Sequence, residues 1–187
     1  MVEMITLGIL ADTHIPDRKR ELNPAVLDVF RQGKVGAILH AGDISTASVL
    51  STLEQIAPVY AVRGNRDWVA LKSLPANRLL TFNGVQVGLT HGHGDFRRYL
   101  IKRIEYIFQG YHVDMFLPVV RAQFPTADVM VFGHTHRPYM QHENGRLILN
   151  PGSPHVPEGE KTPPSVALLH IQPGGEFASE LVNLESI

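Results

Sequence analysis

Apolar residues in the first third of the chain fall in short uninterrupted runs, separated by polar and glycine-containing segments. The runs at 4–11, 35–39 and 59–62 have the length of strands and are mainly aliphatic. They predict strands covered on both faces of a sheet. Apolar residues at helical spacing follow Asn23 and Ser45, between the runs. This β-α-β-α-β order predicts parallel strands joined by right-handed crossovers.

Capping residues mark where these two helices begin and end. Asn23 before Pro24 predicts an N-cap and a first helical position, and Gly33 ends the segment. Either Ser45 or Thr46 is suited to cap the second helix.

The second half is predicted to be mainly antiparallel. Asn-Gly pairs at 83–84 and 144–145 each separate two strand-like runs, which is a strong hairpin signal. The run 129–132 predicts a further buried strand. Two strands, 165–171 and 177–184, close the chain.

Two more helices are expected, one at 96–108 from its apolar spacing and a short one around 115–124. We find no internal repeat and no linker-like segment. A single domain spanning residues 1–187 is therefore expected.

Composition narrows the possible partners. A formal net charge of -1 and a pI near 6.8 give no electrostatic reason to expect nucleic acid or a membrane surface as the main partner. No apolar window approaches the roughly 20 residues of a membrane span, so a cytoplasmic protein is expected. The chain has no cysteine, so a metal would have to be held by histidine, carboxylate, amide or water.

Potential metal ligands follow the predicted strands. His134 and His136 come after the run 129–132, and if the chain stays extended they share one side. For this His-x-His alone, solvated loop histidines are an equally good interpretation. The same construction recurs, however, at other strand ends. The donors are Asp12, His14, Asp43, Asn65, His91, His134 and His136.

One metal ion rarely needs seven donors. Two ions about 4 Å apart do, when one carboxylate bridges them, and this is the geometry of binuclear hydrolases acting on phosphate esters.

The motifs, in chain order, are Asp12-x-His14, Gly42-Asp43, Gly64-Asn65, His91 and Gly133-His134-x-His136. Together they resemble those of the calcineurin-like metallophosphoesterases, and the chain is most similar to their small bacterial and archaeal phosphodiesterase branch. The segment Asn150-Pro151-Gly152-Ser153 is also typical of that branch. The resemblance implies an α/β fold, a four-layer α/β/β/α sandwich, parallel in its first half and mainly antiparallel in its second.

The resemblance also implies a ligand set and an activity. Asp12, His14 and His136 would hold the first metal, Asn65, His91 and His134 the second, and Asp43 would bridge. The implied cofactors are two divalent metal ions, manganese first, with iron, zinc or nickel as alternatives. The implied activity is hydrolysis of phosphoric diesters, in which a water or hydroxide between the ions attacks phosphorus.

Three residues are expected to act on the substrate: Asn65, Arg66 and His93. Many family members carry histidine where this chain has Arg66. A guanidinium can clamp a phosphate but is a poor proton donor, which leaves His93 or a metal-bound water as the acid. The alternative is a surface Arg66 paired with Asp67. His93 is interpreted as a supporting or substrate-facing residue and not as an eighth ligand.

Two rival functions stay open. A phosphomonoesterase or protein phosphatase would surround the phosphate with several basic residues, and near the motifs we find only Arg63, Arg66 and Arg97 or Arg98. A non-catalytic binding module, similar to the retromer subunit of this family, would lack part of the ligand set that this chain keeps.

The expected partner is a small phosphodiester substrate. No membrane is expected, nucleic acid is expected only as a substrate, and the resemblance allows a homo-oligomer. Residues 96–124 are where we expect substrate specificity. His40 is interpreted as a structural or ligand-supporting residue, and the ordinary histidines are His112, His142, His155 and His170.

Overall fold

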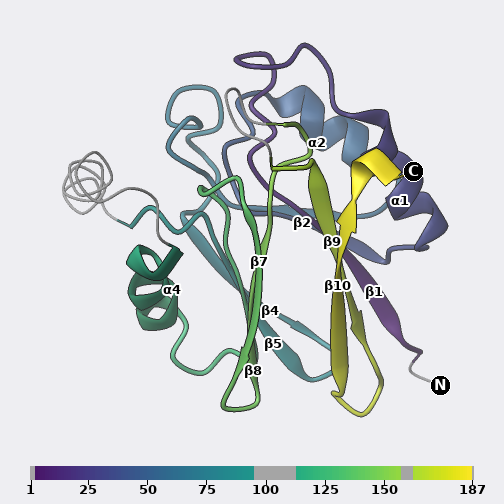
Figure 1. Ribbon diagram of the computed structural model, residues 1–187, viewed down its shortest axis with the longest axis vertical. Helices are drawn as coiled ribbons and strands as arrows, with labels where there is room; N and C mark the ends of the chain where they lie inside the picture. The colour runs from purple at the N-terminus through teal and green to yellow at the C-terminus, as the bar shows by residue number, and fades with distance from the viewer. Residues whose placement is uncertain (1–2, 95–112, 157–161, 187) are drawn as a thin grey trace.

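Two five-stranded sheets face each other in the computed structural model, which describes residues 3–94, 113–156 and 162–186 (Figure 1). The first sheet has the order β10-β9-β1-β2-β3 and the second β4-β5-β6-β8-β7. The strands of the first sheet are β1 (Ile5–Leu10), β2 (Ala37–His40), β3 (Val59–Ala61), β9 (Ser165–Ile171) and β10 (Phe177–Asn183). Those of the second are β4 (Asn77–Phe82), β5 (Val85–Thr90), β6 (Val129–Val131), β7 (Pro138–Glu143) and β8 (Arg146–Pro151).

Each sheet contains three parallel strands. β1, β2 and β3 are parallel, as the crossover pattern predicts, and β9 and β10 add to them in antiparallel order. In the second sheet β5, β6 and β8 are parallel. The edge strands are antiparallel to their neighbours: β4 pairs with β5, and β7 pairs with β8. The predicted antiparallel second half is therefore correct for its hairpins and closing strands, but it also contains a parallel centre.

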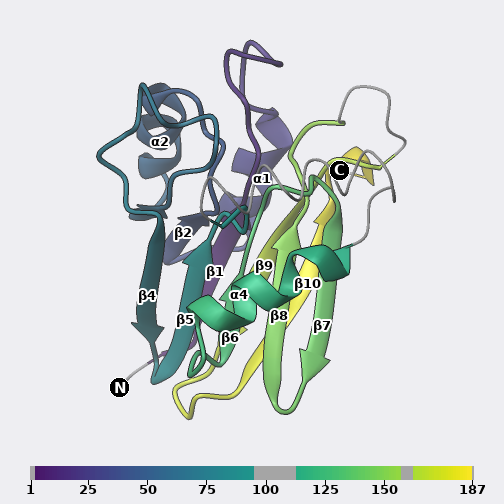
Figure 2. The same ribbon diagram turned by 90° about the vertical axis from the view of Figure 1, so that its left-hand side faces the viewer.

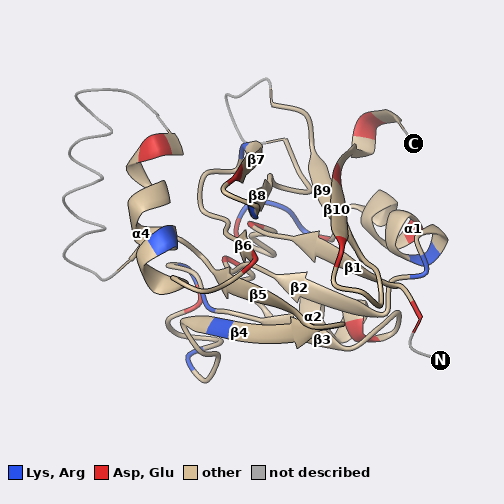
Figure 3. Ribbon diagram, turned by 90° about the horizontal axis from the view of Figure 1, so that it is seen from below, with Lys and Arg blue, Asp and Glu red and all other residues tan. Residues whose placement is uncertain are grey.

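Helices cover the outer face of both sheets. α1 (Pro24–Gln32) and α2 (Ala47–Glu54) lie against the first sheet, and α4 (Leu117–Gln123) lies against the second (Figure 2). Seen end-on, the order from one side to the other is α4, second sheet, first sheet, α1 (Figure 3). The four-layer α/β/β/α arrangement is confirmed.

Three apolar cores separate these layers because side chains alternate between the two faces of a strand. In β1, Leu7 and Ile9 point into the core between the sheets, whereas Leu10 packs with Phe30 of α1. On the other side of the molecule, Phe124 packs in the core beneath α4. The central core consists of side chains from both sheets, so the sheets are fixed to each other by hydrophobic burial.

The predicted helix starts are partly correct. Asn23 caps α1 by accepting a hydrogen bond from the Ala25 N–H at 3.1 Å. Thr46 occupies the N-cap position of α2, but its side chain makes no capping bond and lies near the Ser48 hydroxyl instead. The predicted helix at 96–108 lies outside the described residues. Among those described, no helix is both long and apolar enough to cross a membrane.

Candidate functional site

The candidate metal centre lies where the parallel strands end. Loops after β1, β2 and β3 come from the first sheet, and loops after β5 and β6 come from the second. Carboxyl ends of parallel strands meet at one edge of a sheet. The seven donors predicted from the sequence all lie on these loops, and the structure brings them together.

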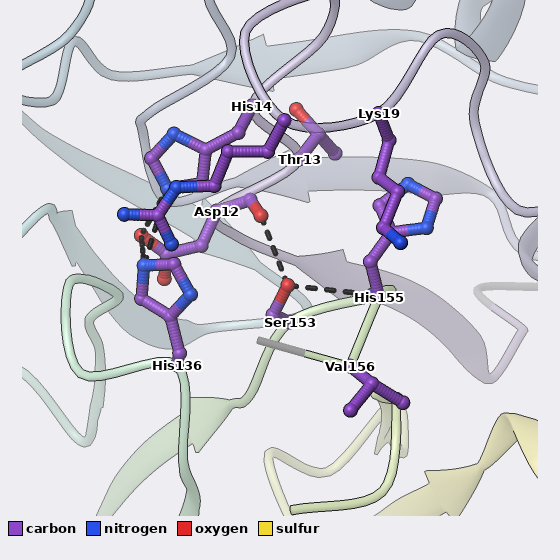
Figure 4. A pocket seen from close by; sticks show the side chains of 9 residues that line it. Asp12, Thr13, His14, Lys19, His136, Ser153, His155 and Val156 are labelled. Carbon is purple, nitrogen blue, oxygen red and sulfur yellow. Dashed lines mark hydrogen bonds and ion pairs between the residues drawn. The ribbon is translucent and has the colours of Figure 1, made fainter. Parts of the chain in front are cut away.

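One half of the centre is formed by His14 and His136. Their Nε2 atoms lie 3.1 Å apart, and the Oδ1 atom of Asp12 lies 3.9 Å from the first and 3.6 Å from the second (Figure 4). The two rings are stacked, with 17° between their planes. Three potential ligand atoms from distant parts of the chain thus surround one small volume.

The other half is formed by Asn65, His91 and His134. The Oδ1 atom of Asn65 lies 3.2 Å from His91 Nε2 and 3.0 Å from His134 Nδ1. The two ring nitrogens are themselves 3.2 Å apart. Phe116 contacts His134 edge-on, so the segment just before α4 supports this half of the centre.

Two carboxylates lie between the halves. Asp43 places Oδ2 at 3.6 Å from His14 Nε2 and Oδ1 at 3.4 Å from His91 Nε2. Asp12 Oδ1 is also 4.0 Å from His91 Nε2. Asp12 belongs to both groups of potential ligand atoms, and Asp43 reaches both halves, so either carboxylate is placed to bridge.

The backbone of these loops is unusual. Asp12, His14, Asp43, His134 and His136 have φ angles between 50° and 72°, in the left-handed region. Residues other than glycine rarely adopt this backbone conformation, because it costs free energy. The chain does not stay extended after Gly133, which is the condition for the two histidines to share one side: the Thr135 N–H bonds back to the Gly133 carbonyl at 2.9 Å. This turn, and not strand alternation, sends the two histidines to opposite halves of one site.

Glycines before the ligands allow the loops to touch. A Cβ on Gly64 would overlap the carboxylate of Asp43, and one on Gly42 would lie 2.8 Å from the Gly64 nitrogen and from His91 Nδ1. The sequence argument that a bulkier neighbour would crowd the acid is thus supported by the packing.

Burial and mutual charge set the protonation of the centre. Burial raises the pKa of Asp12 to about 8, against the opposing charge of His91. Burial would also raise the pKa of Asp43, but His91 outweighs it by charge and hydrogen bonding, and the pKa is lowered. Burial would lower the pKa of His91, but the two carboxylates raise it to about 9. Without a cation, the centre therefore combines one ionised acid, one protonated acid and one imidazolium.

Two other histidines of the centre, His14 and His134, are held neutral. Burial lowers the pKa of His14 to about 3 and places that of His134 well below its usual range. Neutral imidazole is the form that binds a metal. These ligands therefore need no deprotonation before a cation binds at pH 7.

The donor set fits divalent cations. Asp12 Oδ1 is fully buried and has no hydrogen-bond partner among the described residues, although Oδ2 of the same group accepts the His134 N–H at 2.8 Å. A buried carboxylate oxygen without a partner is costly. His91 directs Nδ1 at the Ala41 carbonyl, 2.7 Å away, which leaves Nε2 facing the site. A cation would supply the missing partner to the Asp12 oxygen, and the His91 nitrogen faces the same space.

The predicted substrate residues lie around this centre. The His93 ring is 5.3 Å from that of His91, and burial lowers its pKa to about 4. The side chain of Arg66 is exposed, and its backbone N–H donates to Asp43 Oδ1 at 2.8 Å. Asp67, considered a surface partner for Arg66, is instead fully buried.

Asp67 is a positioning residue that the sequence analysis missed. Its carboxylate accepts four backbone N–H groups at 2.7 to 3.0 Å, from Asp43, Ile44, Ser45 and Gly64. It therefore ties the loop of one ligand, Asp43, to the loop that carries Asn65. No local pattern distinguishes such an acid from a surface acid.

The segment 150–153 supports the centre through hydrogen bonds to the loops after β6 and β1. Asn150 donates to the Gly133 carbonyl at 2.9 Å and to the Thr135 hydroxyl at 3.0 Å. Ser153 donates to the Asp12 carbonyl at 3.0 Å. These bonds hold the two left-handed turns, which explains why this segment accompanies the ligand motifs.

His40 is a structural residue, and its burial predicts acid sensitivity. Its Nδ1 accepts the Gly42 N–H at 3.3 Å, so Nε2–H faces the Thr13 hydroxyl at 3.3 Å. Burial lowers its pKa from 6.5 to about 3. Below pH 6.5 the unfolded chain binds a proton here that the folded chain refuses, so the free energy of unfolding falls as pH falls.

We expect His40→Gln to flatten this dependence. In chelator, the wild-type unfolding free energy between pH 6.5 and 4.5 should fall more steeply than that of the variant, by about 1 kcal/mol per pH unit. Urea unfolding at several pH values measures both slopes, with exposed His142→Gln as the matched control. Equal slopes for wild type and His40→Gln would contradict the burial effect.

The fold and the site together define a class: two-sheet α/β proteins that gather imidazole, carboxylate and amide donors for divalent cations at the ends of parallel strands. The family model of the calcineurin-like phosphoesterase superfamily domain matches residues 5–174, and the chain belongs to this family. The family expected from the five motifs is thus confirmed.

Relatives within the family differ in description. A probable metallophosphoesterase of Methanothermobacter thermautotrophicus is 38% identical over 176 residues, covering 94% of this chain and 91% of that protein. Vacuolar protein sorting-associated protein 29 of Schizosaccharomyces pombe is 26% identical over 172 residues, covering 88% and 83%. The solved structure of Vacuolar Protein Sorting 29 from Cryptosporidium parvum has a TM-score of 0.72 at 20% identity, covering 96% and 97%, which shows likeness of fold alone.

Proposed function

We propose that this phosphoesterase hydrolyses phosphoric diesters with two divalent cations, manganese first, held between its two sheets. The observation that carries the proposal is the buried oxygen of Asp12, which has no hydrogen-bond partner among the described residues and lies within 4.0 Å of three imidazole nitrogens. Such an atom is a cost unless a cation engages it. The probable metallophosphoesterase described above is 38% identical to this chain over 176 residues.

The ligand roles follow the two halves of the centre. Asp12, His14 and His136 would hold one cation, and Asn65, His91 and His134 the other, with Asp43 between them. Cations held here would act as Lewis acids toward the phosphoryl oxygens and would acidify a water molecule.

The remaining chemistry belongs to the chain's own groups. Arg66, next to Asn65 and exposed, is placed to reach a substrate phosphate, and its permanent charge would stabilise the charge that builds on the phosphoryl group. When water adds to phosphorus and the ester bond breaks, the leaving oxygen gains a proton, which a water molecule in the site would supply. His93, neutral at pH 7 because burial lowers its pKa to about 4, suits a hydrogen bond to the substrate better than proton donation.

Two rival functions, a phosphomonoesterase and a non-catalytic binding module, are also compatible with some of these observations. A phosphomonoesterase would use the same donors. A binding module is favoured by the similarity to Vacuolar protein sorting-associated protein 29. The binding module does not explain why three loops would keep five left-handed residues around an unpartnered carboxylate oxygen, since strained backbone of this kind is costly without a function.

Metal analysis combined with an activity assay tests the proposal. We expect close to two equivalents of metal after manganese loading, and hydrolysis of bis-p-nitrophenyl phosphate that chelator abolishes. The monoester p-nitrophenyl phosphate is the comparison substrate. Activity on the monoester alone would establish the first rival. Metal-loaded protein without activity on either ester would contradict the hydrolase proposal and favour a binding module.

A further inference from the structure

A pocket opens beside the first half of the metal centre. It encloses about 380 Å³ of empty space, part of it open to solvent. Asp12, His14 and His136 form one side (Figure 4). The residues on the other side come from two loops, one after β1 and one after β8, and include Arg18, Lys19, Ser153 and His155.

The first loop brings two cationic side chains to the pocket. After His14 the chain turns back, so that the N–H groups of Arg18 and Lys19 both point at the His14 carbonyl, at 2.9 and 3.4 Å. Both side chains are exposed at the pocket mouth. Arg18 lines the pocket together with Asp12 and His14, which places this guanidinium beside the centre.

The second loop adds an imidazole. His155 lies beside Lys19 in the pocket (Figure 4), and its Nε2 atom is buried without a hydrogen-bond partner among the described residues. Its backbone N–H donates to Ser153 Oγ at 3.3 Å, and that hydroxyl donates to the Asp12 carbonyl, so the loop is anchored to the centre. Burial first, and then Lys19, lowers the pKa of His155 to about 4, so the ring is neutral at pH 7.

Outside the metal centre, the charged side chains among the described residues of this pocket are both positive. Among the described residues that line it, Asp12 is the one acid, and it belongs to the candidate metal centre. The acid nearest in sequence to the cations, Asp17, accepts a hydrogen bond from Ser45 at 3.0 Å. The positively charged side chains of Arg18 and Lys19, and the imidazole of His155 with its unpartnered nitrogen, therefore face the space next to the potential metal ligands. This combination favours an anion.

We infer that Arg18, Lys19 and His155 form a subsite for a second anionic group of the substrate, next to the scissile phosphate. The inference rests on the proposed function and names its substrate class: phosphodiesters whose alcohol carries a phosphate or a carboxylate. The second group would lie on the side of His14 and His136, because the pocket opens there. From its sequence neighbours His155 is an ordinary histidine, and no sequence pattern marks Arg18 or Lys19.

Binding of inorganic phosphate to the metal-free protein tests the subsite without catalysis. In chelator, we expect phosphate to shift the NMR resonances of the His155 ring in a saturable manner. Lys19→Gln should weaken this binding about tenfold, the size of one charge-assisted hydrogen bond. Arg20→Gln, which removes an exposed charge from the same loop at a residue lining a different pocket, is the matched control. No saturable shift, or equal weakening by both variants, would overturn the subsite.

A pair of substrates tests its role in selectivity. p-Nitrophenyl phenyl phosphate and its analogue with a carboxylate on the phenyl ring differ by one negative charge. The manganese-loaded wild type should favour the carboxylated diester by about tenfold in kcat/KM, because its KM for that substrate is lower while kcat is similar. The variant Arg18→Gln should show a smaller ratio between the two substrates. Equal rates on the two diesters would overturn the selectivity while leaving the diesterase intact. If neither is hydrolysed, the proposed function fails, and the phosphate titration alone decides the subsite.

Discussion

Asp12→Asn is expected to lower kcat/KM for diester hydrolysis at least about a thousandfold and, at the same time, to stabilise the metal-free protein. The activity falls because an amide cannot replace a charged ligand that lies between the two halves of the centre, and a thousandfold corresponds to about 4 kcal/mol of transition-state stabilisation. The amide can still accept the His134 N–H that Asp12 Oδ2 accepts now.

The gain in stability follows from the pKa of Asp12, raised from 3.8 to about 8 by burial. Between these pH values the folded chain holds a proton that the unfolded chain has lost, so the wild-type unfolding free energy falls as pH rises. Asparagine has no such proton. At pH 7 in chelator the variant should therefore exceed the wild type by about 1 kcal/mol or more.

Urea unfolding in chelator and diester assays with manganese measure the two effects. Asp28→Asn, an exposed acid on α1, is the control for both. A variant that loses activity and also loses metal-free stability would mean that the charge of Asp12 serves the fold, and would contradict its place in a cation site.

Asp67→Asn should produce the largest loss of stability, about 3 kcal/mol or more. Each oxygen of Asp67 accepts two backbone N–H groups. An amide has one acceptor oxygen, so in either orientation its NH₂ group would face two N–H donors inside the protein. The cost combines two lost bonds to a charged acceptor with unsatisfied buried donors.

The diesterase activity of Asp67→Asn should also fall, about ten- to a hundredfold, because Asp67 holds the loops of Asp43 and Asn65 in contact. Chemical denaturation and manganese affinity of the purified variant measure the two losses. The Asp28→Asn control applies here as well. A variant with wild-type stability would show that the four N–H groups find other acceptors, and Asp67 would then not be a positioning residue.

Much of the fold is predictable because it depends on local patterns. Apolar runs and Asn-Gly turns locate the strands and hairpins, and the cap formed by Asn23 locates α1. The parallel centre of the second sheet is harder to predict, since the crossover from β5 to β6 passes through a segment whose pattern is ambiguous. The short helix predicted around 115–124 is present as α4.

The cluster of potential metal ligands is predictable for a different reason: each of these residues follows a strand, and strand ends converge by topology. Asp67, Arg18 and Lys19 are not, because their roles arise from contacts between loops that are distant in sequence. His155 shows the limit most clearly. No ligand-type residue flanks it, yet its ring nitrogen is buried next to Lys19 in a pocket that the centre shares.

The division of the donors between the sheets has a consequence for the mechanics of the molecule. Asp12, His14, Asp43 and Asn65 hang from the first sheet, and the three remaining histidines from the second. An ion bound by both sets would add a link between two sheets that are already joined by hydrophobic burial, by loop contacts and by hydrogen bonds such as that from the Arg78 guanidinium to the Ala61 carbonyl. Filling the centre would therefore fasten one end of the sandwich, and we expect the metal-free protein to open first at that end.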